Sequence, residues 1–101
     1  MKNLAVSRRY AKALILIGQE DGQADGYNDE LSAMVGLLDA NEGFEQALTN
    51  PLIKKSDRKK LLDTVIAAAG FSKVMKSFLS LLFDKGRIGF TRDIATYYNT
   101  M

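Results

Sequence analysis

The sequence predicts an all-α protein folded as a compact six-helix bundle, and three observations support this. Apolar residues recur at helical spacing along the whole chain, no useful length of it alternates as a strand does, and it contains one proline in 101 residues. The breaks between periodic segments are short, which favours antiparallel helical neighbours. An apolar content of 47% suits one core, so residues 1–101 are predicted to form a single domain.

The first two helices are predicted on either side of a glycine. The first spans residues 3–20 and stops before Gly22, because glycine readily adopts the left-handed conformation that ends helices. The second spans residues 26–40, with Asp25 as its N-cap. Its buried face is predicted to contain Tyr27, Leu31, Met34, Val35 and Leu38.

The third helix is predicted to be short and to follow Asn41. Its apolar residues are Phe44, Ala47 and Leu48. It should end at Asn50, since the residue before a proline, here Pro51, avoids the helical region.

The fourth helix is predicted to start after Ser56 and to close at Gly70. Asp57 is then favourable near the positive end of the helix dipole. The buried face of this helix should contain Leu61, Leu62, Val65, Ile66 and Ala69.

The last two helices follow Ser72. This serine is predicted to cap the fifth helix, which ends at Gly86. The sixth begins at Phe90 or Thr91, and its buried face should contain Phe90, Ile94, Tyr97, Tyr98 and Met101.

The first and fifth helices have apolar arcs of roughly 200°, whereas a helix on one core needs only somewhat more than about 100°. The arc of the first contains Ala13, Val6, Ile17, Tyr10, Leu14, Gly18, Ala11, Leu4 and Ile15. The arc of the fifth contains Leu81, Val74, Phe78, Leu82, Met75, Leu79 and Phe83. Either the other four helices cover both arcs, or the two helices present a joint groove for a guest helix.

Composition argues against catalysis and metal binding. The sequence has no cysteine and no histidine, which removes thiolate chemistry, the commonest general base and the commonest metal ligand. Its acidic residues fall at helix ends and turns rather than in apolar runs. Asp21, Asp25 and Asp29 have a spacing reminiscent of a calcium loop, but the remaining ligands of that motif are missing. We therefore expect no enzyme activity, no cofactor and no metal.

Basic residues offer a different interpretation. One cluster contains Lys54, Lys55, Arg58, Lys59 and Lys60, and Arg8, Arg9 and Lys12 flank the first helix. Such clusters can bind phosphates or anionic lipid, but more often they are solvated faces. The net charge is only +2 and no nucleic-acid-binding motif accompanies the clusters, so nucleic acid is not an expected partner. No run of 18 apolar residues is present to span a membrane.

A series of short motifs spans the chain in a fixed order. It consists of Arg9-Tyr10-Ala11-Lys12-Ala13-Leu14, Leu48-Thr49-Asn50-Pro51, Lys59-Lys60-Leu61-Leu62, Phe78-Leu79-Ser80-Leu81-Leu82, Gly86-Arg87-Ile88 and Ile94. In order and spacing the series resembles the amino-terminal domain of the delta subunit of F-type ATP synthases, the family that includes the oligomycin-sensitivity-conferring protein. The chain departs from the family pattern at Arg8-Arg9, where Arg-Pro is usual, and at Ser77, where an Asn often precedes Phe-Leu.

The resemblance implies the same helical fold and a groove between the first and fifth helices. In the family, this groove receives the helical amino-terminus of one alpha subunit. Carried over to this chain, the expected contact residues are Tyr10, Ala13, Leu14, Ile17, Val74, Phe78, Leu79, Leu82 and Phe83. Val74 and Phe83 lie at the two flanks of the fifth-helix arc and are candidates for the groove edge.

The resemblance also implies a non-catalytic stator component of a proton-translocating ATP synthase. It would sit at the cytoplasmic side of the inner membrane, peripheral and not inserted. Attachment to the b subunits of the peripheral stalk is expected mainly through the family's carboxy-terminal domain, which this sequence lacks. The alternatives are a helical adaptor of another complex, or a binder of nucleic acid or anionic surfaces through the Lys and Arg clusters.

Overall fold

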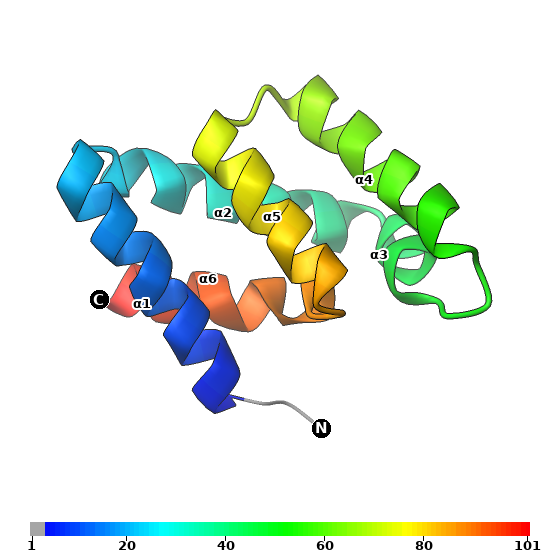
Figure 1. Ribbon diagram of the computed structural model, residues 1–101, viewed down its shortest axis with the longest axis horizontal. Helices are drawn as coiled ribbons and strands as arrows, with labels where there is room; N and C mark the ends of the chain where they lie inside the picture. The colour runs from blue at the N-terminus through cyan, green and yellow to red at the C-terminus, as the bar shows by residue number, and fades with distance from the viewer. Residues whose placement is uncertain (1–3) are drawn as a thin grey trace. The chain divides into compact units, whose positions relative to one another are not determined.

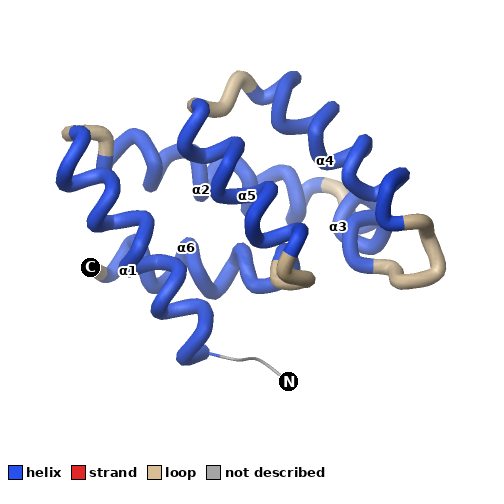
Figure 2. The backbone as a smooth tube through the Cα atoms, in the orientation of Figure 1, coloured by secondary structure: helices blue, strands red, loops and turns tan. Residues whose placement is uncertain are grey.

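The computed structural model describes residues 4–101, which form six α-helices and one short 3₁₀ helix and contain no strand (Figures 1 and 2). In chain order these are α1 (Leu4–Asp21), α2 (Ala24–Ala40), α3 (Glu42–Thr49), α4 (Lys55–Ala69), α5 (Lys73–Asp84), the 3₁₀ helix η1 (Ile88–Phe90) and α6 (Thr91–Thr100). The predicted all-α class with six helices is confirmed. The predicted first residue of the first helix, Asn3, lies outside the described residues.

Two predicted starts are wrong, and the first is that of α2. The helix already begins at Ala24, so Asp25 lies in its first turn and is not its N-cap. The early start follows from a tight reversal at Gly22, which has φ of +77°. The next residue, Gln23, donates its N–H to the Gly18 carbonyl at 3.0 Å, a bond typical of a helix that ends in a left-handed glycine.

The second wrong start is that of α4, which begins at Lys55 and not after Ser56. The carbonyl of the preceding residue, Lys54, accepts hydrogen bonds from the N–H groups of Asp57 and Arg58 at 3.1 and 3.0 Å. The backbone is thus helical before the serine, and no side chain caps it. Asp57 lies in the first turn, as predicted.

Three other predicted helix ends are confirmed. The Asn41 Oδ1 accepts from the Phe44 N–H at 3.1 Å, which caps α3. The Ser72 Oγ accepts from the Met75 N–H at 3.2 Å, which caps α5. Gly70 closes α4 in the left-handed conformation, with φ of +69°. These three ends could be predicted because each depends on one local side chain or one glycine.

The chain divides into two units, and the first comprises the residues up to Leu37 together with Phe90–Met101. In this unit α1 packs against α6. The Arg8 guanidinium also lies over the Tyr97 ring, 5.2 Å from its centroid. The buried apolar residues are Val6, Ala11, Leu14, Tyr27, Leu31, Met34, Ile94 and Tyr98. Met101 was predicted to be buried but is exposed, because it follows the last turn of α6.

The second unit is Leu38–Gly89, in which α3 packs against α4. Its buried apolar residues are Leu38, Phe44, Leu48, Leu62, Ile66, Met75, Phe78, Leu79, Leu82, Phe83 and Ile88. Ala69 was predicted to be buried but is exposed in the last turn of α4. Leu61 and Val65 are half-buried, so the buried stripe of α4 is narrower than predicted.

Within residues 4–101, none of the helices has both the length and the apolar character that a bilayer crossing requires.

Candidate partner-binding surfaces

The apolar arc of α1 has a buried side and an exposed side. Val6, Ala11, Leu14 and Gly18 are buried. On the other side Ala13 is exposed, Ile17 is 42% exposed and Tyr10 is half-buried. The three residues Tyr10, Ala13 and Ile17 are one helical turn or two apart and form a continuous strip, which we call the α1 flank. Part of this apolar arc is therefore exposed.

The arc of α5 is more fully covered. Met75, Leu79 and Leu82 are fully buried, and Phe78 and Phe83 are nearly so. The exposed part of the arc lies at its other end, where Leu81 is 44% exposed and Val74 is half-buried. We call Val74 and Leu81 the α5 flank. Leu81 was not among the predicted contact residues. Its position at one end of the apolar arc on the helical wheel could have indicated that it is exposed.

Phe83 was a candidate for an exposed edge, but within its own unit it is covered and only 3% exposed. The Arg58 guanidinium lies 5.6 Å from the centroid of its ring, and the Lys55 ammonium lies 6.0 Å from it. Long cationic side chains often bury their stems against apolar surface while the charge stays in water. Lys55 and Arg58, which the sequence places in a basic cluster, thus cover the ring of Phe83.

Arg58 has a second structural task. Its Nε donates to the Ile53 carbonyl at 3.0 Å, and its Nη1 donates to the Leu48 carbonyl at 3.4 Å. It thereby joins the end of α3, the following loop and α4 with the ring on α5. Charge-assisted bonds to carbonyls of this kind contribute more than neutral ones.

The nine predicted contact residues therefore differ in accessibility. Tyr10, Ala13, Ile17 and Val74 have side-chain surface to offer. The buried ones are Leu14, Phe78, Leu79, Leu82 and Phe83. The first four positions of the set belong to the first unit and the other five to the second. The buried residues can support a surface from beneath, whereas the accessible ones could touch a partner.

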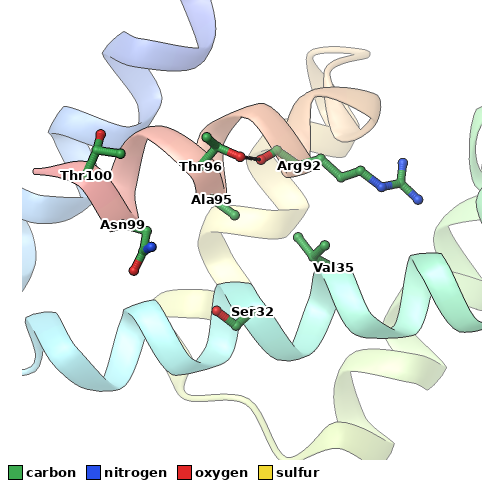
Figure 3. Close-up of a pocket in the computed structure, with 7 residues that line it drawn as sticks. All are labelled: Ser32, Val35, Arg92, Ala95, Thr96, Asn99 and Thr100. Atoms are coloured by element: carbon green, nitrogen blue, oxygen red, sulfur yellow. Dashed lines mark hydrogen bonds between the residues drawn. The ribbon is translucent and has the colours of Figure 1, made fainter.

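An open pocket of about 430 Å³ lies between α2 and α6 in the first unit. Figure 3 shows Ser32 and Val35 on α2 opposite Ala95 and Asn99 on α6. Arg92, Thr96 and Thr100 complete the lining, and Thr96 donates its hydroxyl to the Arg92 carbonyl at 3.0 Å. The only ionisable side chain of the lining is Arg92, whose guanidinium has N–H donors and no acceptor. The pocket thus offers no proton acceptor for acid–base chemistry.

The corner between α1 and α2 contains a tyrosine with a raised pKa, Tyr27. The Tyr27 hydroxyl donates to Asp21 Oδ2, while Asp21 Oδ1 accepts from the Gln23 N–H at 2.9 Å. The hydrogen bond to the carboxylate raises the pKa of Tyr27 to about 12, with desolvation as a smaller cause. Burial, and then the charge of Asp25, raises the pKa of Tyr98 in the same unit. Both effects favour the neutral form of these phenols.

The spacing of Asp21, Asp25 and Asp29 in this corner is reminiscent of a calcium loop, although no metal was expected there. Within residues 4–101, no three His, Cys, Asp or Glu side chains come together closely enough to hold an ion. Asp21 is instead used by the turn, as described above.

By fold, residues 4–101 are an all-α domain of six α-helices. Residues 6–101 match the family model of the ATP synthase delta (OSCP) subunit, and the chain belongs to this family. It is 52% identical over its full length to ATP synthase subunit delta of Desulforapulum autotrophicum and covers 55% of that protein. The corresponding protein of Geotalea uraniireducens is 37% identical over 97% of this chain, which covers 54% of it. The chain thus spans about half the length of the curated relatives it matches.

A solved structure has the same fold. A chain in the cryo-EM structure of the Polytomella F-ATP synthase superposes with a TM-score of 0.84 at 22% identity. The match covers 93% of this chain and 82% of that one. The six-helix fold is therefore that of a chain found in an assembled ATP synthase.

Proposed function

We propose that this chain is a component of the peripheral stalk of an F-type ATP synthase. It would bind the amino-terminal helix of an alpha subunit and so tie the catalytic head to the stalk. Membership of the delta subunit family supports the assembly. The relatives' remaining length would carry most of the contact with the b subunits. In this assembly the chain would be peripheral, at the cytoplasmic side of the inner membrane.

The proposed alpha-subunit contact is supported mainly by the exposure of the α1 flank. An isoleucine that is 42% exposed lies beside a half-buried tyrosine and an exposed alanine on one strip of a helix. The strip suits an amphipathic helix, because Ala13 allows close backbone approach and Tyr10 gives a broad apolar face with a polar tip. The α5 flank, with Val74 and Leu81, is a second proposed contact surface for a helical partner.

The apolar character of both flanks suits a mechanical joint. Rotation of the central shaft applies torque to the head, so a tether must dissociate slowly. Affinity differences between related interfaces lie mostly in the off-rate, and buried apolar contact is not screened by salt. The proposed role is structural, without catalytic residues in this chain.

A titration with a synthetic peptide tests this proposal. The peptide is the alpha-subunit amino terminus of Desulforapulum autotrophicum, whose delta subunit is 52% identical to this chain. We expect saturable binding that Ala13→Glu abolishes, since this change puts a charge into a dry interface. The matched control is Leu37→Ser, a change at an exposed leucine on α2, which should leave binding intact.

The competing functions predict different outcomes. If the peptide does not bind the folded chain, the alpha-subunit contact is wrong, and an adaptor role in another complex gains support. If Ala13→Glu and the parent bind the peptide equally, the α1 flank is not the docking surface.

A further inference from the structure

Positive charge is concentrated in one short segment of the second unit. Residues 54–60 contain five of the 14 Lys and Arg residues but one of the 12 acidic residues. The segment therefore has a net charge of +4, while the rest of the chain has a net charge of −2. A field of this kind, confined to one place, attracts negatively charged partners to that place.

The same segment adjoins an apolar side chain held in solvent. Leu52, in the loop between α3 and α4, is 91% exposed. Its loop is ordered by hydrogen bonds: Asn50 Oδ1 accepts from the Leu52 N–H at 2.9 Å, and the Asn50 carbonyl accepts from the Ile53 N–H at 3.2 Å. Arg58 also donates a hydrogen bond to the Ile53 carbonyl, so Leu52 projects from a loop whose backbone is fixed by hydrogen bonds. We call Leu52, Lys54 and Lys60, which are close together in the sequence, the Leu52 patch.

The position of these positive charges is unfavourable for the stability of α4. Lys54 and Lys55 stand at the N-terminus of α4, where the helix dipole disfavours cations. Arg58 and Lys55 have a structural use over Phe83, and Lys59 has a partner in Asp63 at 3.1 Å. Lys54 and Lys60 are exposed, and no such use is apparent for them.

From these observations we propose that the Leu52 patch docks an acidic polypeptide segment of a partner protein, one that carries an apolar residue among its carboxylates. The lysines would pair with the carboxylates, and Leu52 would be the single apolar anchor. This contact is independent of the proposed alpha-subunit contact, which uses the α1 and α5 flanks. Where the acidic segment belongs to the same assembly as the alpha subunit, two joints on one chain hold more tightly than either alone.

The patch fits other anionic partners less well. Single-stranded nucleic acid is bound by aromatic stacking, but residues 50–60 contain no aromatic residue and the nearby Phe83 ring lies under Lys55 and Arg58. A lipid surface would be held by the lysines and one leucine, which buries little apolar area compared with an acyl chain or the face of an amphipathic helix. An acidic polypeptide uses both features of the patch at once.

The test is a binding titration of the 101-residue chain with a fluorescein-labelled peptide of repeating Glu-Glu-Leu-Ala units. We expect saturable binding that weakens steeply as salt rises. Lys54→Gln combined with Lys60→Gln should weaken it about three- to tenfold, and Leu52→Ser about tenfold. The matched controls are Lys73→Gln with Lys76→Gln, two exposed cations on α5, and Leu37→Ser; none should change the affinity.

Parallel titrations use anionic phosphatidylserine vesicles, a single-stranded oligonucleotide and the alpha-subunit peptide. The proposal is overturned if the acidic peptide does not bind, or if the Leu52-patch variants bind it as the parent does. It is also overturned if vesicles or the oligonucleotide bind more tightly and displace the peptide. The patch variants should still bind the alpha-subunit peptide, so failure of one proposal is distinguishable from failure of the other.

Discussion

α1 and α5 have the same sequence property, an apolar arc wider than one core requires, but the structure treats the excess differently. On α1 the excess is the flank of Tyr10, Ala13 and Ile17, which keeps surface exposed. On α5 one end of the arc, at Phe83, lies beneath two cationic side chains from α4. A wide arc thus indicates that something covers the excess. It does not say whether this is a partner or the stem of a lysine or arginine.

The largest expected effect separates the covered end of α5 from the exposed flank of α1. Phe83→Ala should lower the free energy of unfolding by about 3–5 kcal/mol, since it removes a buried ring and leaves a cavity. Ile17→Ala should change it by no more than about 0.5 kcal/mol, as is usual at exposed positions. Urea unfolding of both variants measures the two values. Equal losses would mean that the α1 flank is core, and the comparison would fail.

The next effect concerns the buried side of α1. A Cβ at Gly18 would lie 2.6 Å from the Ala24 Cα, a backbone atom that cannot easily move aside. Gly18→Ala should therefore destabilise the chain by about 1–3 kcal/mol. Gly36, in the middle of α2, is the matched control because nothing lies within 4 Å of its added Cβ. Gly36→Ala should stabilise by about 0.4–1 kcal/mol, and thermal unfolding of both variants compares them.

The exposed side of α1 should matter for binding more than for folding. Tyr10→Ala should weaken the alpha-subunit peptide by about 2 kcal/mol, because it removes an interface anchor. Isothermal titration calorimetry measures the affinity, and the thermal midpoint of the same sample reports folding. A large loss of stability with unchanged affinity would assign Tyr10 to the core instead.

The smallest effect is a pH dependence within the first unit. The Asp21 carboxylate raises the pKa of Tyr27 to about 12, from about 10 in the unfolded chain. The stabilisation linked to this proton is complete below pH ~10 and is lost as the pH rises toward ~12. Urea unfolding across this range should show a decline that Tyr27→Phe reduces. An unchanged decline in the variant would mean that another group is responsible.

The sequence predicted most of the fold because most helix ends depend on one residue. Asn41, Ser72 and Gly70 act locally, and each was found at its predicted end. The starts of α2 and α4 were missed because Asp25 and Ser56 have the right chemistry for a cap, but the backbone is already helical when the chain reaches them. A capping preference ranks candidates and does not fix the register of a turn.

The candidate surfaces were only partly predictable. Helical spacing placed Tyr10, Ala13 and Ile17 on one strip, and the structure keeps this strip accessible. It could not show that Phe83 is covered, because the covering residues are charged and 25–28 positions away in the chain. Helical periodicity also did not predict that Leu52 is exposed, because its exposure depends on the turn formed at Asn50.

The pinned loop between α3 and α4 has a consequence for proteolysis. Trypsin recognises Lys54 and Lys55, and both side chains are exposed. A protease also requires several residues of free, extended backbone, and here Asn50 and Arg58 hold the loop by hydrogen bonds. Cleavage must therefore wait for the loop to open, and its rate reports that opening equilibrium rather than the accessibility of the lysines. This loop is thus expected to resist nicking, although Leu52 is 91% exposed, while Arg58 stays in place.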